Sequence, residues 1–254
     1  MHNFIPFKTI ISKEVNRFMR IWTQTLLPPV INQILYFLVF GTFIGRAVGE
    51  IQGLSYIEFI IPGLVAMTVL NGSFMNVVSS FFGAKFQKQI EELLVSPITT
   101  NTIILGFTLA SMLRGVLVGI LVYLTSQFFV PTSIVNPGYL MVIVFLSAFV
   151  FAQAGLSNAI FAKKFDDINI FPTFVLRPLV YFGGVFYSVA SLPEKWQLVT
   201  KINPIFYMVD GFRFGFFGVS ELSANYALYI LALFAAGFYA FNYYLISNGI
   251  RLKN

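Results

Sequence analysis

The sequence predicts an all-α integral membrane protein with six transmembrane helices, and three observations carry this prediction. Of its 254 residues, 57% are hydrophobic and only 10% are charged, against roughly 25% charged in an average soluble domain. The mean hydropathy is +0.81. Several stretches lack ionisable residues over the length of about 20 residues that a helix needs to cross a bilayer. A soluble globule of this size could not cover so much apolar surface, so lipid must be the solvent for most of the chain.

The charged residues separate the chain into spans. The longest charge-poor region, residues 93–162, is interrupted only by Arg114. It is too long for one helix and folds back at residues 130–138, where two prolines, Asn136 and Gly138 predict a turn. The six predicted spans are residues 21–45, 59–84, about 103–129, 139–161, a fifth span that follows Asp167, and 222–250.

Two further segments are predicted not to cross the membrane. Residues 188–221 combine charged and aromatic residues and predict semi-re-entrant or interfacial helices, which need protein or water to satisfy their backbone. Residues 1–20 predict an amphipathic helix in the membrane interface, with packing on a partner as the alternative. Its apolar stripe continues into span one and consists of Phe4, Phe7, Ile11, Val15, Phe18 and Trp22.

The basic residues predict the orientation. With six spans, ten fall on the side of both termini and four on the other side, so both termini are expected to be cytoplasmic. The ten are Lys8, Lys13, Arg17, Arg20, Lys85, Lys88, Lys163, Lys164, Arg251 and Lys253. The four are Arg46, Lys195, Lys201 and Arg213. The net charge of +6 is thus read as a membrane orientation signal, and no nucleic-acid partner is expected.

The composition argues against enzymatic chemistry. The chain has no cysteine and a single histidine, which excludes thiolate catalysis and nearly every zinc or transition-metal site. No acid and base pair stands beside a nucleophile, and we expect no catalytic residues, no metal and no bound cofactor. The sequence also lacks the Gly-x-x-x-x-Gly-Lys loop that cradles nucleotide phosphates.

Residues 83–97, between spans two and three, predict a short cytoplasmic amphipathic helix. Phe86, Ile90, Leu93 and Leu94 form one face, and the charged residues, among them Glu91 and Glu92, form the other. Pro97 ends the helix. The segment is either a docking element for a soluble motor subunit or a solvated loop helix without a partner.

These features together resemble the ABC-2 type permeases, the membrane subunits of ATP-binding cassette exporters. The run Ile90 to Pro97 looks like the coupling segment of that family, and the layout of helices matches over nearly the whole chain. The C-terminal signature of the family is similar to a set of residues before span six. These are Leu192, Pro193, Asn203, Pro204, Tyr207 and Arg213.

The resemblance implies a single ABC-2 transmembrane domain over residues 1–254 in the cytoplasmic (inner) membrane. It implies a homodimer of the chain and a separate ATP-binding subunit that carries ATP and magnesium. That subunit would contact Phe86, Ile90, Glu91, Glu92, Leu93, Leu94 and Pro97. The expected activity is export of an amphipathic, glycan-linked, lipid-linked or drug-like substrate; an ion-coupled carrier or a membrane scaffold is the alternative.

Two arginines and a cluster of aromatic residues are candidates for a substrate pathway. Arg114 and Arg177 lie within predicted spans, where a charge is expensive unless it meets a partner helix, water or an anionic substrate group. Bonding to backbone carbonyls or snorkelling to the membrane surface are the structural alternatives. The aromatic candidates are Tyr181, Phe186 and Tyr187, for which an interfacial aromatic belt is the alternative to a surface that stacks on substrate.

Overall fold

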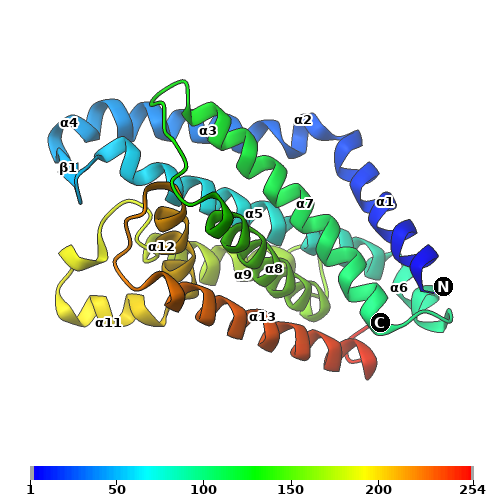
Figure 1. Ribbon diagram of the computed structural model, residues 1–254. Coiled ribbons are helices and arrows are strands. Elements are labelled where there is room, and N and C mark those ends of the chain that lie inside the picture. Colours follow the sequence, from blue (N-terminus) through cyan, green and yellow to red (C-terminus); the bar gives the residue numbers. More distant parts are fainter. Residues whose placement is uncertain (1–2, 253–254) are drawn as a thin grey trace.

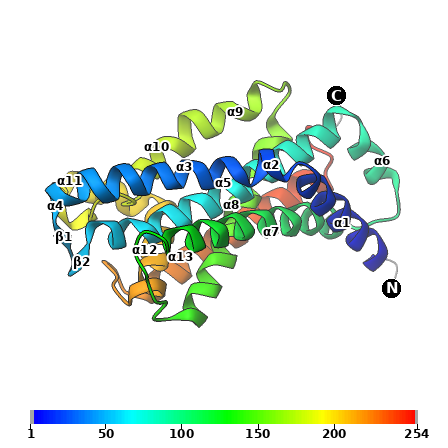
Figure 2. The same cartoon turned by 90° about the horizontal axis from the view of Figure 1, so that it is seen from above.

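The computed structural model describes residues 3–252, with all of their side chains except those of Thr42 and Arg46. It is an elongated bundle of helices (Figure 1). The start of α1 (Phe4–Arg20), the end of α13 (Ala224–Ser247) and α6 (Gln89–Val95) gather at one end. At the opposite end lie α4 (Gly45–Val48), α11 (Glu194–Ile202) and a small hairpin, and Figure 2 shows the same arrangement from above. Residues 1 and 2 of the predicted interfacial helix, and Lys253 of the charge count, lie outside the described residues.

Five helical segments are long and apolar enough to cross a membrane. They correspond to predicted spans one to four and six, and they are Trp22–Gly41, α5 (Tyr56–Phe86), α7 (Thr100–Ser126), α8 (Pro137–Phe161) and α13. The first of them combines α2 (Trp22–Thr25), α3 (Leu27–Tyr36) and the π-helix η1 (Phe37–Ile44). The prediction of an all-helical membrane protein is therefore confirmed, with five candidate spans.

The predicted fifth span is shorter than the others. It consists of α9 (Asp167–Phe171), the π-helix η2 (Pro172–Leu176) and α10 (Arg177–Tyr181). These 15 residues rise about 22 Å, less than the roughly 30 Å of a hydrocarbon core. Pro172 and Pro178 lack the N–H that a regular helix needs, which accounts for the π-helical turn between them.

Residues 188–221, predicted to be semi-re-entrant or interfacial, contain several short helices. A 3₁₀ turn η3 (Val189–Ser191), α11 and α12 (Pro204–Phe217) follow one another before α13. The last of these is buried among α5, α8 and α13. At the same end of the bundle, β1 (Glu50–Ile51) pairs with β2 (Leu54–Ser55) as an antiparallel hairpin between η1 and α5.

The central helix of the bundle is α5, which lies between α7 and α8. In its most apolar window 72% of the residues are buried, whereas only 17% are buried in Trp22–Gly41. The outer segment Trp22–Gly41 is thus largely exposed and can contact lipid or another chain. Within the core α5 approaches α7 closely, since a Cβ placed on Gly72 would lie 2.8 Å from the Cα of Gly115.

The N-terminal helix α1 packs on α7. Ile10, Glu14 and Phe18 are its buried residues, while Phe4 is 69% exposed and Trp22 is 53% exposed. The buried face includes Glu14, whose carboxylate is satisfied by hydrogen bonds described below, and the apolar stripe shares only Phe18 with it. The interfacial position of the stripe stays a prediction.

We expect Gly115→Ala to destabilise the chain. A Cβ at Gly115 would lie 2.7 Å from the carbonyl oxygen of Val69, a backbone atom that cannot move without shifting α5. Overpacking of this kind costs about 1–3 kcal/mol of unfolding free energy. Thermal denaturation of the purified protein in detergent measures it. Gly237→Ala is the control because a Cβ there meets nothing within 4 Å, and equal stability of the two variants would contradict the close approach.

Candidate functional site

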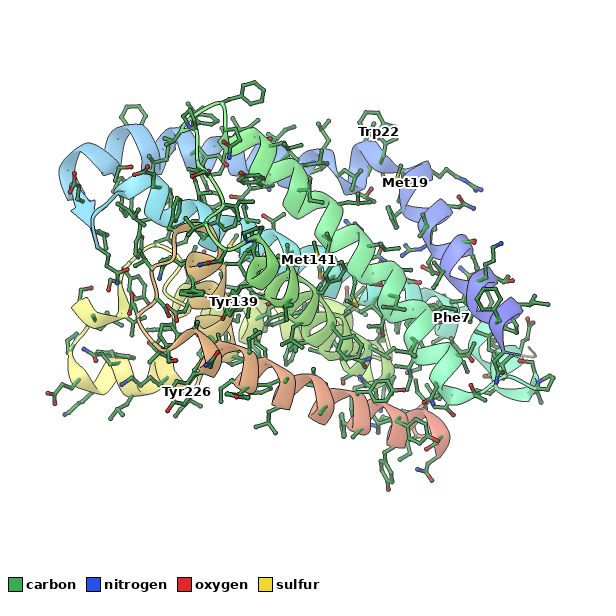
Figure 3. The ribbon with its side chains drawn as sticks, in the orientation of Figure 1. Phe7, Met19, Trp22, Tyr139, Met141 and Tyr226 are labelled. Atoms are coloured by element: carbon green, nitrogen blue, oxygen red, sulfur yellow. The ribbon has the colours of Figure 1, made fainter. Side chains whose placement is uncertain are left out.

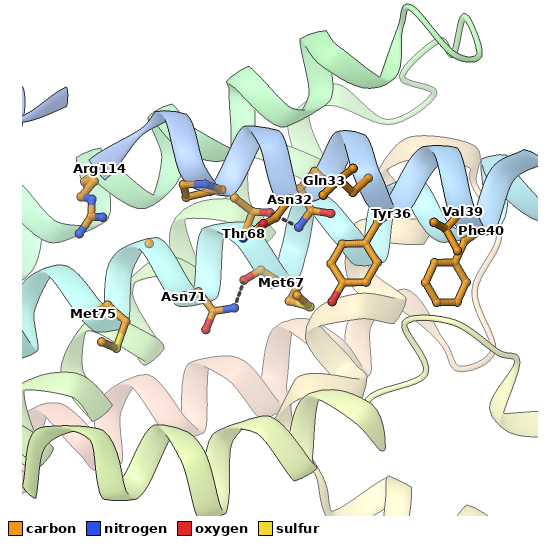
Figure 4. Close-up of a pocket in the computed structure, with 13 residues that line it drawn as sticks. Asn32, Gln33, Tyr36, Val39, Phe40, Met67, Thr68, Asn71, Met75 and Arg114 are labelled. Atoms are coloured by element: carbon orange, nitrogen blue, oxygen red, sulfur yellow. Dashed lines mark hydrogen bonds between the residues drawn. The ribbon is translucent and has the colours of Figure 1, made fainter. Parts of the chain in front are cut away.

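A cavity of about 610 Å³ lies between the Trp22–Gly41 segment and α5, with Arg114 of α7 at one end (Figure 4). Its volume falls within the range of small-molecule sites. We call it the groove. The residues that line it are Pro29, Asn32, Gln33, Leu35, Tyr36, Val39, Phe40, Met67, Thr68, Asn71, Gly72, Met75 and Arg114.

The polar residues of the groove stand at the middle of their helices. Asn71 is the central residue of α5, Arg114 follows the centre of α7 by one residue, and Asn32 lies midway along Trp22–Gly41. Asn32 and Asn71 are exposed in the single chain. An exposed amide in hydrocarbon costs several kcal/mol, so this face is unsuited to contact with lipid.

Arg114 is only partly satisfied by the protein. Its Nη2 donates to the carbonyl oxygen of Thr25 at 3.1 Å, and its Nε is buried without a hydrogen-bond partner. The described residues form two ion pairs, and Arg114 takes part in neither. The charged side chain that acts on it is Arg17, which has the same sign. Arg114 thus lines the groove and also bonds a backbone carbonyl, and its contact with substrate stays a prediction.

The groove changes from polar to aromatic along its length (Figure 4). Near its middle, Gln33 Nε2 donates to Thr68 Oγ1 at 3.0 Å, while Gln33 Oε1 is buried without a partner. Beyond this pair lie Tyr36 and Phe40, whose ring centroids are 5.7 Å apart. The ring of Phe186 stacks on Phe40 at 4.9 Å, so this predicted pathway residue extends the aromatic end.

The other predicted pathway residues lie outside the groove. Arg177 and Tyr181 are exposed on α10 and do not line the groove as described. Tyr187 donates its hydroxyl to the carbonyl oxygen of Tyr181 at 3.1 Å. The segment that carries Arg177 is short and leaves the arginine exposed, and a contact of these residues with substrate stays a prediction.

The predicted coupling segment is a helix of seven residues, α6, separated from α5 by a tight turn. Lys88 adopts a left-handed conformation with φ of 61°, which breaks the helix between Phe86 and Ile90. Ile90 is buried, Leu93 and Leu94 are half-buried, and Glu92 and Pro97 are exposed. Glu91 is half-buried.

Phe86 does not share the apolar face of α6. It ends α5, is 54% exposed, and its ring lies 4.8 Å from that of Phe165 in the loop after α8. The predicted face assumed one continuous helix, and the turn at Lys88 rotates Phe86 out of it.

Asp167, the first residue of α9, accepts the backbone N–H groups of Lys163 and Lys164 at 2.8 and 3.0 Å. These hydrogen bonds hold the pKa of the Asp167 carboxyl below its ordinary value.

The predicted signature residues hold the short helices together. Asn203 caps α12 by accepting the N–H of Ile205, and it donates to the carbonyl oxygen of Leu179 at 2.6 Å. Pro204 occupies the first turn of α12, and Tyr207 donates to the carbonyl oxygen of Lys201 at 2.6 Å. Leu192 and Pro193 precede α11, where the carbonyl oxygen of Leu192 accepts from the side chain of Gln197. They are structural contacts in this chain.

Arg213 lies at the centre of a buried charged cluster. Its Nη2 donates to the carbonyl oxygen of Gly184 at 2.9 Å, its Nη1 lies 3.7 Å from Glu221, and its guanidinium is 3.9 Å from the ring centre of Phe59. Glu221 also accepts the backbone N–H groups of residues 189 and 190. Asp210, on the same helix as Arg213, accepts the N–H of Glu221 at 2.7 Å.

Sequence reasoning missed a second polar cluster at the end of the bundle that carries the termini. Glu14 is 3% exposed, lies 2.9 Å from Arg17 and accepts a hydrogen bond from Ser80. Arg17 donates to Asn76 of α5 at 3.0 Å, and Asn76 donates to Ser111 of α7 at 2.9 Å. The cluster therefore joins α1, α5 and α7. The i, i+3 spacing of Glu14 and Arg17 was the available signal.

Comparisons with known proteins agree with this architecture. A family model described as ABC-2 type transporter matches residues 6–217. The chain is 48% identical over 255 residues to the inner membrane transport permease YadH of Escherichia coli, covering 100% of both chains. It is 25% identical over 197 residues to Nodulation protein J of Rhizobium meliloti, covering 76% of this chain and 75% of that protein. The chain therefore belongs to the ABC-2 type transporter family, a family of transport permeases rather than of enzymes.

Proposed function

We propose that the chain is the membrane subunit of an ATP-driven exporter in the cytoplasmic membrane. It moves an amphipathic, glycan-linked, lipid-linked or drug-like substrate, and a separate subunit binds and hydrolyses ATP. The 48% identity to a transport permease over the full chain supports this proposal. The chain contributes the pathway and the docking surface and binds no nucleotide itself.

The observation that carries the proposal is the polar groove at mid-membrane depth. Asn32 and Asn71 are exposed at the middle of two apolar helices, and Arg114 stands beside them. In a membrane scaffold, exposed amides at this depth would only raise the free energy of the folded protein, because they contact hydrocarbon. A pathway that contains water and polar substrate groups explains them.

A second copy of the chain would close the groove. The outer segment Trp22–Gly41 is mostly exposed, so the groove has a wall on one side only. Two copies that face each other across their grooves would enclose a shared pathway. Each copy would cross the membrane six times if the short segment 167–181 also spans a locally thinned bilayer.

Coupling to the ATP-binding subunit would act through α6 and α5. The first of these is attached to the end of α5 by the turn at Lys88. Since α5 is one helix of 31 residues that also carries Met67, Asn71 and Met75, a displacement at α6 moves the wall of the groove. A rigid-body shift of this kind is a common form of switching between two states.

The charges orient the molecule with α6 in the cytoplasm. The end that carries α6 also carries Lys85, Lys88, Lys163 and Lys164, together with the basic residues of α1. This excess favours the inner side of the membrane for that end. Both termini are then cytoplasmic as well.

An ion-coupled carrier is the competing function. Carriers of that kind commonly hold a carboxylate at mid-membrane depth. The described residues that line the groove include no Asp or Glu. We therefore favour ATP-driven export.

A cysteine at position 71 is expected to react with a water-soluble thiol reagent. The natural chain contains no cysteine, so a single introduced thiol reports its own position. Asn71→Cys and Asn32→Cys should label rapidly in intact membranes, because a thiol in contact with water ionises more readily than one in apolar surroundings. Leu117→Cys is the control: Leu117 lies one turn beyond Arg114 on α7 and is 41% exposed outside the groove. Equal protection of all three positions would show a groove filled by lipid and would contradict the pathway.

A further inference from the structure

We propose that the groove binds the oxyanion head of an amphipathic molecule, a carboxylate or phosphodiester, with Arg114 as the residue that contacts the anion. This inference rests on the proposed function for its biological meaning, because it names the class of molecule that the pathway accepts. Its physical argument depends only on the charges and contacts within the groove.

The first step is the charge balance. Arg114 stands at the middle of α7, where an unpaired cation is expensive. Arg17, the charged residue that acts on Arg114, is already paired with Glu14 at 2.9 Å, and Glu14 also accepts from Ser80. Arg17 and Glu14 therefore neutralise each other, and one positive charge remains on Arg114. An anion that enters the groove would neutralise it.

The second step is the unused hydrogen-bonding capacity of the guanidinium. Arginine has five N–H donors in a planar fork that matches a carboxylate or phosphate. The structure gives Arg114 a single hydrogen bond, to the carbonyl oxygen of Thr25, and leaves its buried Nε without a partner. The protein therefore engages Nη2 of Arg114 and leaves other N–H donors of the guanidinium available to an oxyanion.

The third step is the gradient along the groove. Asn71 and Asn32 follow Arg114, and Tyr36 and Phe40 lie at the far end (Figure 4). A molecule with a charged head, a polar neck and an apolar or ring-containing body matches this order. Figure 3 shows the side chains of the whole bundle in the orientation of Figure 1.

Two sources could supply such a head: an anionic phospholipid of the membrane or a transported amphiphile. The test uses the full chain in nanodiscs of phosphatidylcholine, without any ATPase. The probes are 11-(dansylamino)undecanoic acid and its methyl ester, which differ only in the negative charge. We expect the acid to bind at least tenfold more tightly than the ester, since charge-assisted hydrogen bonds are about twice as strong as neutral ones.

Variants assign this preference to Arg114. Arg114→Gln should remove the preference for the acid, and Arg114→Lys should retain most of it. Asn71→Asp provides a second route, because a carboxylate placed in the groove should repel the acid while Arg114 stays intact. Arg20→Gln is the matched control, since Arg20 is an exposed arginine of α1 outside the groove. Size-exclusion profiles and the affinity of the ester show that each variant is folded.

Nanodiscs that contain phosphatidylglycerol distinguish the two sources. Displacement of the acid by phosphatidylglycerol supports a resident lipid head in the groove, and undisturbed binding supports a transported amphiphile. Equal binding of acid and ester by the natural chain would overturn the proposal, as would a preference that survives in both Arg114→Gln and Asn71→Asp. Because the assay involves no ATP and no transport, that result would leave the exporter function standing.

Discussion

Replacing both Glu91 and Glu92 with lysine is expected to abolish ATP-driven transport while the chain still inserts into the membrane. The double variant changes four units of charge on α6, a helix whose buried contact is made by Ile90 on the other side. Like charges brought together in an interface cost several kcal/mol. A basic surface on the partner would therefore be repelled.

Transport and partner-dependent ATP hydrolysis in vesicles measure this effect, and we expect a loss of at least tenfold. Glu50→Lys is the control, because Glu50 is an exposed acidic residue on the hairpin at the opposite end of the bundle. Normal transport by the double variant would remove the coupling role from α6.

The largest loss of stability is expected for Arg213→Met. The side chain of Arg213 is 1% exposed and that of Glu221 is 7% exposed, so removal of the guanidinium leaves a carboxylate buried without its counter-charge. Breaking a buried pair in this way costs about 3–5 kcal/mol. For a chain of this size, the thermal midpoint in detergent should fall by roughly 10 °C.

The double variant Arg213→Met/Glu221→Gln separates the charge from the packing. Removing both charges should restore at least half of the lost stability, because no unpaired ion then remains. Arg177→Met, which alters an exposed arginine on α10, should stay within about 0.5 kcal/mol of the natural chain. A stable single variant Arg213→Met would show that the pair with Glu221 contributes nothing.

The spans could be predicted because each depends on local composition. A run such as residues 139–161 excludes charge over the thickness of a bilayer, and the observed helix Pro137–Phe161 follows it closely. The same reasoning placed Arg114 inside a helix, facing a partner helix or a cavity. It could not identify Asn32 and Asn71 as the neighbours of that arginine, since three separate helices bring them together.

The remaining errors have a common physical origin. The turn at Lys88 requires a left-handed conformation that is uncommon for lysine, and the local sequence does not predict it. The burial of Glu14 depends on Ser80 and Asn76, which are more than 60 residues away in sequence from Glu14. These tertiary hydrogen bonds bury Glu14 on the same face of α1 as Ile10 and Phe18.

Affinity purification of the tagged full chain from a mild detergent tests the central claim most directly. The copurifying chains are identified, and ATP hydrolysis by the eluate is measured, for the natural chain and for the Glu91→Lys/Glu92→Lys variant. We predict that an ATP-binding subunit with a phosphate-binding Gly-Lys loop copurifies with the natural chain and is lost or uncoupled with the variant. Absence of any ATPase across several mild detergents would contradict the account and favour a carrier or scaffold that works alone.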